Sequence, residues 1–200
     1  TRHLLSMKIV IDGLIGAGKS TQAELLSEVC NFPVVKEPID EWPLDKFYED
    51  PSRWGLMMQA AVLTSFVRFR DTQGIFERSP ESSGAVFWRN LVESGVVTTE
   101  EDQIFRKLAN ELSWEPDVMI YIDKSPEKCH EHIQKRNQVG DEKVSLEYLK
   151  TLEKYYRDFC EKNKTSTHIV DGNQSIEKVH QDIVKIINVY IKKICPHANM

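Results

Sequence analysis

Short apolar runs alternate with longer segments of helical periodicity along this chain. Residues 8–12 form a β-branched run that passes directly into glycine-rich residues. Four further runs have the length and apolar character of buried parallel strands, at 32–36, 74–77, 118–123 and 168–171. The pattern therefore predicts a sheet of five strands.

The segments between these runs repeat apolar residues every three or four positions, which predicts helices. Residues 23–29 show this spacing after the glycine-rich loop, and so do the stretches 56–69 and 101–112. A final helix begins after a predicted N-cap at Ser175 and carries an apolar stripe from Ile176 to Ile194. Alternating strands and helices predict an α/β fold around a mainly parallel sheet.

The chain shows no repeat, low-complexity stretch or long Gly/Ser/Pro linker, so we expect one domain over residues 7–194. Residues 1–6 precede Met7 and the first apolar run, and we interpret them as a leader outside the fold. Residues 134–143 are polar and charged, with Gly140 among them, and are expected to form an exposed flexible segment.

Composition narrows the partners of this globular chain. Its 26 Lys and Arg against 31 Asp and Glu leave a formal net charge of −5, without the positive field that favours nucleic acid or anionic membranes. The apolar runs are all shorter than the ~18 residues of a membrane span. The four cysteines form no CxxC pair, which favours a reducing compartment. These features predict a cytoplasmic protein that binds neither nucleic acid nor membranes.

The glycine-rich loop carries the strongest motif. It fits the pattern GxxxxGK followed by Ser or Thr, after an apolar strand and at a helix start. In such a loop the backbone N–H groups surround phosphate oxygens, Lys19 neutralises the β and γ phosphates, and the Ser20 hydroxyl can bind Mg²⁺. We therefore predict binding of ATP, or another nucleoside triphosphate, with Mg²⁺. The predicted loop site is Gly13, Leu14, Ile15, Gly16, Ala17, Gly18, Lys19, Ser20 and Thr21.

Acidic residues follow the second and third strands, where the strand ends of a parallel sheet face the ligand crevice. Glu37 is either a Mg²⁺ ligand, an acceptor for the proton of a substrate hydroxyl, or a surface acid before a helix-starting proline. Glu77 and Arg78 form either an exposed ion pair or a second Mg²⁺-side carboxylate with a cation for the attacking oxygen.

Over most of residues 8–187 the chain resembles the deoxyribonucleoside kinase family. The segments that carry the resemblance are the P-loop, Glu37-Pro38 with Trp42, Tyr48 with Gln59, Glu77-Arg78-Ser79 with Phe87, and Pro126-Glu127 leading through Arg136 to residues 146–149. The resemblance implies a three-layer P-loop kinase fold with a five-stranded parallel sheet flanked by helices, and a short lid at about 134–143. It also implies ATP-dependent phosphorylation of a deoxyribonucleoside 5′-hydroxyl in nucleotide salvage, and a homodimer.

By this resemblance Glu37 is the general base on the 5′-hydroxyl and Arg78 orients that oxygen. Lys19 and the lid residue Arg136 stabilise the phosphoryl charge, and Ser20 and Glu77 bind Mg²⁺. The lid departs from the family pattern, because His132 and Gln138 stand where arginine is common. The implied nucleoside pocket comprises Tyr48 and Glu147 at the sugar 3′-hydroxyl, Gln59 at the base edge, Phe87 stacked on the base, and Trp42, Met58, Phe66 and Ser83 along the wall.

Base choice depends on the last two of these residues. Phe66 follows Gln59 by seven positions and Ser83 precedes Phe87 by four, where relatives that accept deoxycytidine and purines carry an Arg and an Asp. An uncharged edge accommodates the 5-methyl group of thymine. We therefore expect thymidine, or another pyrimidine deoxynucleoside, to be the best substrate.

Two other functions fit parts of the sequence. A nucleoside monophosphate kinase of the thymidylate kinase type is the main alternative, because residues 11–13, 16–25 and 170–175 also fit that relative. A monophosphate acceptor is already ionised and needs no general base, so Glu37 favours a hydroxyl acceptor. A P-loop switch without phosphoryl transfer to a small molecule would lack a base pocket, and the pocket set named above speaks against it.

Overall fold

The computed structural model describes residues 7–138 and 140–194, and the expected leader at residues 1–6 lies outside them. It contains one parallel sheet of five strands, in the order β2-β3-β1-β4-β5. This confirms the five-stranded parallel α/β fold predicted from the sequence. The strands are β1 (Lys8–Gly13), β2 (Val34–Val35), β3 (Gly74–Glu77), β4 (Val118–Asp123) and β5 (Thr167–Asp171).

β1 is the central strand, and its register runs Ile11 to Glu77 on β3 and Ile11 to Ile120 on β4. The chain winds to one side of β1 for β2 and β3 and to the other side for β4 and β5. The carboxyl end of β1 is therefore the point where the winding reverses, and open α/β sheets bind their ligands at such a point.

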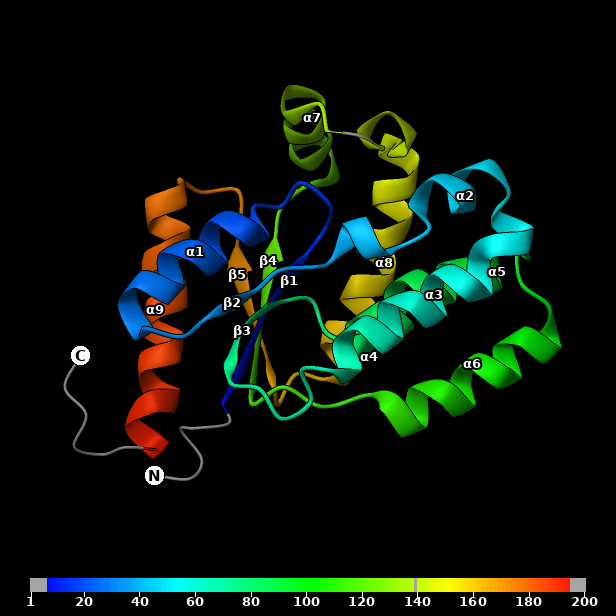
Figure 1. Ribbon diagram of the computed structural model, residues 1–200. Coiled ribbons are helices and arrows are strands. Elements are labelled where there is room, and N and C mark those ends of the chain that lie inside the picture. The colour runs from blue at the N-terminus through cyan, green and yellow to red at the C-terminus, as the bar shows by residue number, and fades with distance from the viewer. Residues whose placement is uncertain (1–6, 139, 195–200) are drawn as a thin grey trace.

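Helices cover both faces of the sheet (Figure 1). α1 and α9 lie on one face, while α3, α4 and α8 lie on the other. The helices are α1 (Lys19–Cys30), α2 (Leu44–Glu49), α3 (Pro51–Val67), α4 (Pro80–Ser83), α5 (Arg89–Glu93), α6 (Thr99–Leu112), α7 (Pro126–Arg136), α8 (Leu146–Lys162) and α9 (Ile176–Ile194), with short turns η2 (Ile39–Glu41), η3 (Gly84–Trp88) and η4 (Asp141–Lys143).

The predicted and observed elements differ mainly at their ends. β2 begins at Val34 instead of residue 32, because Pro33 has no N–H to donate to the sheet, and it ends at Val35 instead of residue 36. α3 begins at Pro51 instead of residue 56, with the Asp50 carboxylate accepting a hydrogen bond from the Arg53 N–H at 3.1 Å. Polar first turns of this kind have no apolar periodicity, so the sequence pattern places the helix start too late.

The final helix packs through its predicted stripe. Val179, Ile183, Ile187 and Ile191 are buried against the sheet and α1. The Ser175 Oγ accepts a hydrogen bond from the Lys178 N–H at 3.3 Å, as expected of an N-cap. The middle of the stripe is therefore part of the core, whereas Ile176 at its start is 54% exposed.

The segment 134–143, expected to be exposed and flexible, is exposed at most of its described residues and is partly helical. α7 continues through Arg136, because Cys129 and Ile133 anchor it in the core, and it ends at Asn137 in the left-handed conformation. Residues 141–143 form the helical turn η4.

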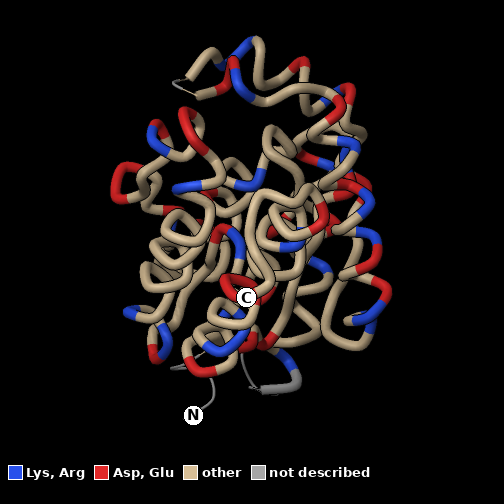
Figure 2. Tube along the Cα trace, turned by 90° about the vertical axis from the view of Figure 1, so that its right-hand side faces the viewer, with Lys and Arg blue, Asp and Glu red and all other residues tan. Residues whose placement is uncertain are grey.

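Charged residues are intermixed along the chain trace, with acidic and basic positions close to one another (Figure 2). Of the helices in the described ranges, none combines the length and the apolar composition needed to cross a membrane.

Candidate active site

A cleft of about 1010 Å³ opens at the carboxyl ends of β1, β2 and β3. It joins the P-loop to side chains from α3, η3, α7 and α8 in a single cavity. The predicted site residues that line it are Ile15, Gly16, Gly18, Lys19, Ser20, Thr21, Glu37, Trp42, Tyr48, Met58, Gln59, Glu77, Arg78, Ser83, Phe87 and Arg136. Gly13, Leu14 and Ala17 shape the loop from behind.

The P-loop depends on glycine at two positions in particular. Gly16 has a φ of +83°, and a Cβ there would lie 2.5 Å from the Cys129 carbonyl oxygen of α7. Gly18 has a φ of +99° and precedes the first turn of α1, with open space where a Cβ would project. The loop can therefore expose its N–H groups and the amino end of α1 to an anion.

Lys19 is almost fully buried in the loop it follows. Its Nζ donates hydrogen bonds to the Leu14 carbonyl at 2.9 Å and the Gly13 carbonyl at 3.3 Å. Burial, reinforced by the Arg78 cation, lowers the pKa of Lys19 to about 8. The ammonium group thus has weak protein partners that phosphate oxygens can replace.

The partly buried Glu37 and the buried Arg78 form an ion pair beside the P-loop. The guanidinium Nη1 donates to Glu37 Oε2, and Nη2 donates to the Gly13 carbonyl at 3.4 Å. Its Cζ lies 4.8 Å from the centroid of the Phe87 ring. Burial opposes the charge of Arg78, but Glu37, with Tyr156 and Asp12, outweighs it and raises the arginine pKa well above its ordinary value. The pair presents a carboxylate and a fixed cation to the cleft.

Two residues behind this pair were not identified from the sequence. Asp12 is fully buried, and its Oδ1 accepts hydrogen bonds from the Gly13 N–H and from the Tyr156 hydroxyl, both at 2.7 Å. The Tyr156 hydroxyl in turn accepts from Arg78 Nε at 3.2 Å. An acid ending a buried strand directly before the P-loop was a usable signal for Asp12. The helical spacing of the buried positions of α8 predicts that Tyr156 is buried but not that it contacts Arg78.

Glu77 and Ser20 fit the chemistry of a Mg²⁺ site. Glu77 is buried, and its Oε1 has no hydrogen-bond partner within the described residues. Burial raises the pKa of Glu77, while Lys19 and a hydrogen bond from Ser20 oppose this shift. Mg²⁺ takes one or two carboxylates together with substrate phosphates, so a buried carboxylate beside a P-loop hydroxyl suits it. Clusters of three or more His, Cys, Asp or Glu able to hold a metal do not occur in the described ranges.

The other end of the cleft is largely apolar with one buried amide. Gln59 is 6% exposed, and its Oε1 has no partner in the part of the chain that the structure describes. Met58 and Ser83 are also buried and line the same cleft, as does Phe87 on η3, a π-helical turn. A buried amide oxygen without a partner indicates that a ligand supplies a donor there.

Phe66 does not lie in the cleft, contrary to the sequence prediction. It is 2% exposed and packs edge-on against Trp114, with ring centroids 6.2 Å apart. Seven residues span about 10 Å along a helix, so Phe66 lies beyond the cleft that Gln59 reaches. Val62 on α3 and Leu91 on α5 line the wall instead.

Glu147 is also displaced from its predicted role. Its side chain is 84% exposed, lies 3.4 Å from Lys150 Nζ and does not line the cleft. Successive residues on a helix differ by about 100° in direction, and α8 turns Tyr148 to the cleft and Glu147 to solvent.

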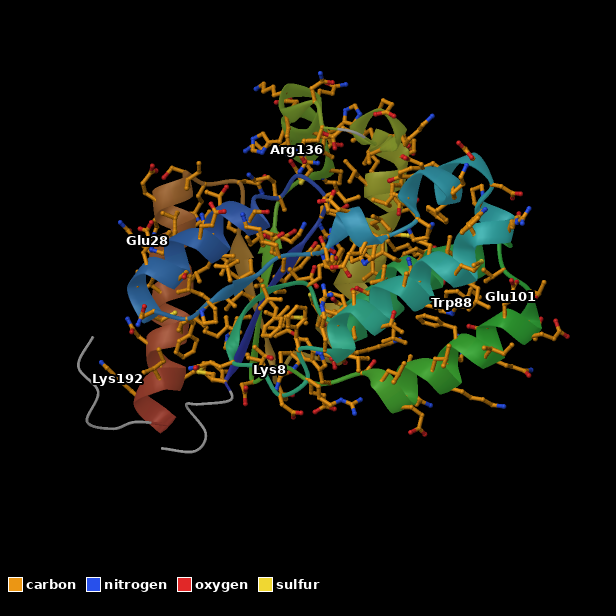
Figure 3. All side chains as sticks on the ribbon, viewed as in Figure 1. Lys8, Glu28, Trp88, Glu101, Arg136 and Lys192 are labelled. Carbon is orange, nitrogen blue, oxygen red and sulfur yellow. The ribbon has the colours of Figure 1, made fainter. Side chains whose placement is uncertain are left out.

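Arg136, labelled at the end of α7 in Figure 3, lines the cleft and forms an ion pair. Its Nη2 lies 2.6 Å from Asp141 Oδ1. His132 and Gln138 also line the cleft, and His132 Nδ1 is 3.2 Å from the Gly16 carbonyl oxygen. The lid side therefore offers one arginine, held by an aspartate.

Comparisons with known proteins agree with this geometry. The family model described as deoxynucleoside kinase matches residues 9–196. Deoxyadenosine kinase of Dictyostelium discoideum is 38% identical over 80% of this chain and 69% of its own, and mitochondrial thymidine kinase 2 of Homo sapiens is 27% identical over 94% and 80%. The solved structure of deoxyadenosine kinase from M. mycoides, with the products dCMP and dCDP, is 25% identical with a TM-score of 0.83, covering 92% of this chain and 100% of that one.

Proposed function

Because the chain belongs to the deoxynucleoside kinase family, we propose that it transfers the γ-phosphoryl group of ATP, or another nucleoside triphosphate, to the 5′-hydroxyl of a pyrimidine deoxynucleoside. Thymidine is the expected best substrate, and nucleotide salvage the expected role. The observation that carries the proposal is the ion pair of Glu37 and the buried Arg78, which shares a cleft with the P-loop.

The ion pair suits a hydroxyl acceptor. A neutral 5′-hydroxyl must lose its proton when it attacks phosphorus, and the Glu37 carboxylate accepts that proton. Such a general base contributes roughly 10² to 10⁴-fold to the rate. Arg78 holds the carboxylate in place and keeps a cation beside the attacking oxygen.

The P-loop end of the cleft binds the phosphates in this proposal. Lys19 exchanges its loop carbonyls for phosphate oxygens, and Arg136 adds a second cation once it leaves Asp141. Ser20 and Glu77 would hold Mg²⁺, which when bound neutralises phosphate charge at this end of the cleft.

The apolar end of the cleft binds the base in this proposal. The Gln59 amide presents a donor and an acceptor side by side, which match a pyrimidine edge, and the Phe87 face suits a flat ring. Val62, Leu91 and the small Ser83 leave the wall uncharged. Burying a thymine 5-methyl group there contributes on the order of 0.8 kcal/mol. Because Phe66 lies in the core, the preference for thymidine rests on this uncharged wall.

A coupled ADP-release assay tests the proposal with four deoxynucleosides and with thymidine monophosphate in parallel. We expect turnover with the nucleosides, the highest kcat/KM with thymidine, and none with the monophosphate. Turnover of the monophosphate alone would replace the proposal by the thymidylate kinase alternative. The highest kcat/KM with a purine nucleoside would overturn the substrate preference and leave the kinase assignment intact.

We also propose that the enzyme is a homodimer. Met57 on α3 and Ile104 and Leu108 on α6 are exposed apolar residues on two helices that pack together. Light scattering on the purified protein tests this, and a monomer at micromolar concentration would overturn it.

A further inference from the structure

The guanidinium of Arg78 has a separate acceptor for each of its nitrogens. Nη1 donates to Glu37, Nη2 donates to the Gly13 carbonyl, and Nε donates to the Tyr156 hydroxyl at 3.2 Å. The first contact faces the cleft, while Tyr156 is 0% exposed and outside the cleft lining. Tyr156 thus touches the arginine from the side that substrate does not reach.

Chemistry fixes the direction of every hydrogen bond behind Arg78. A guanidinium only donates hydrogen bonds, so the Tyr156 oxygen accepts one from Arg78. The Tyr156 O–H then donates a hydrogen bond to Asp12 Oδ1 at 2.7 Å. The same Oδ1 accepts the Gly13 N–H at 2.7 Å. The chain of hydrogen bonds therefore runs from Arg78 through Tyr156 to Asp12 and ends on the first residue of the P-loop motif.

Arg78 needs such a support for two reasons. Its φ of +63° lies in the left-handed region that residues with a side chain rarely occupy. In addition, Asp12 Oδ1 lies 3.7 Å from Arg78 Nε and competes with Glu37 for the guanidinium charge. The Tyr156 hydroxyl occupies Nε and donates to Asp12 Oδ1 at the same time, which leaves Nη1 for Glu37.

We infer that Tyr156, supported by Asp12, is a positioning residue for phosphoryl transfer: its hydroxyl holds the Arg78 guanidinium against Glu37 and ties both to the P-loop. This inference rests on the proposed function. It assigns to α8 a role in catalysis without contact between Tyr156 and the substrate.

The test is the substitution Tyr156→Phe, which removes one oxygen and keeps the ring that stacks on Tyr121 at 5.1 Å. We expect kcat to fall about tenfold, the size of one hydrogen bond to a charged group, and the nucleoside KM to change less than about threefold. Tyr121→Phe is the matched control, because Tyr121 is equally buried and its hydroxyl has no partner within the described residues. Its kcat should stay within about twofold of the unaltered enzyme.

A double-mutant cycle with Arg78→Lys separates positioning from general stabilisation. A lysine has no Nε for the Tyr156 hydroxyl, so Tyr156→Phe should lower kcat less than about twofold in that background. Asp12→Asn provides a second route, because the amide oxygen still accepts hydrogen bonds but the charge is lost. We expect it to lower kcat about threefold, again with less effect beside Arg78→Lys.

Thermal unfolding shows whether each variant is folded. If Tyr156→Phe is unfolded, the test rests on the effect of Asp12→Asn on kcat with Arg78 and with Arg78→Lys. Unchanged kcat in Tyr156→Phe would overturn the inference, and so would an equal loss with Arg78 and with lysine. The proposed function would survive either result, provided that the unaltered enzyme phosphorylates deoxynucleosides and Glu37→Gln lowers kcat by roughly 10²-fold.

Discussion

The phosphate end and the nucleoside end of the cleft are built in different ways. The phosphate end is formed by one contiguous loop, whose glycines, lysine and serine all belong to residues 13–20. The nucleoside end takes single side chains from α3, η3, α5 and α8, which are far apart in the sequence. The geometry of a contiguous motif can be predicted from its sequence. The geometry of a pocket formed by scattered side chains also depends on how far each helix extends past the cleft.

The two ends also differ in charge. Asp12, Lys19, Glu77 and Arg78 are buried around the phosphate end and Glu37 is partly buried there, so that opposite charges attract and the Lys19 and Arg78 cations repel each other. The nucleoside end has mainly apolar side chains and the Gln59 amide. Substitutions at the first end should therefore change the rate of transfer, and substitutions at the second should change the ranking of substrates.

Lys19→Ala should have the largest effect. The change removes a cation from the phosphates without opening a gap in the apolar core, so we expect kcat/KM to fall about 10³-fold or more. Activity and thermal unfolding of the purified variant measure this. Lys36→Ala is the matched control, since Lys36 lines the same cleft but is exposed and paired with Glu24. An equal loss in both variants would mean that the cleft responds to any lost cation.

Glu37→Gln should lower kcat by roughly 10²-fold with little change in the nucleoside KM, because the amide keeps the shape but accepts no proton. Steady-state kinetics with thymidine measure both constants. Glu41→Gln serves as the control, because Glu41 is exposed and pairs with Arg68 outside the cleft. If KM rose while kcat stayed the same, Glu37 would be a binding residue.

The sequence predicted the contiguous parts of the molecule well. The bounds of β3 and β4 agree with the apolar runs at 74–77 and 118–123, and the P-loop lies between β1 and α1 as its motif requires. The scattered parts were harder. The spacing of seven from Gln59 correctly gave the helix of Phe66, but helical spacing does not say where along α3 the cleft ends. Likewise Glu147 precedes Tyr148, which lines the cleft, and only the rotation of α8 about its axis determines which of the two side chains faces the cleft.

Asp12 and Tyr156 illustrate a second limit. A buried tyrosine on an apolar stripe has the same pattern whether it fills the core or holds an arginine. The contact with Arg78 joins residues 78 positions apart, and no local pattern records that pairing.

The activity at the phosphate end should depend on alkaline pH through Lys19. Because its pKa is about 8 in the folded protein against an ordinary 10.5, the free enzyme loses this cation above pH 8. We expect kcat/KM for ATP to fall by up to about tenfold per pH unit there. Burial disfavours the charged lysine in the folded protein, so Lys19 lowers the free energy of unfolding in full below pH 8. This destabilisation is relieved as the pH rises from 8 toward 10.5, the ordinary pKa of lysine. A profile that stays flat to pH 9.5 would contradict the shift.

The smallest effect is expected at the nucleoside end, from Ser83→Asp. Ser83 is 5% exposed on the uncharged wall of the cleft. A carboxylate there only accepts hydrogen bonds, so it favours the amino groups of cytosine and adenine and repels the O4 carbonyl of thymine. We expect the ratio of kcat/KM for thymidine to that for deoxycytidine to fall about tenfold, a difference of roughly 1.4 kcal/mol. Phe66→Leu is the control from the core: it should lower the free energy of unfolding by about 1 kcal/mol and leave the ratio unchanged. The opposite pattern, with Phe66→Leu altering the ratio and Ser83→Asp not, would return Phe66 to the pocket and remove the distinction between core and wall on α3.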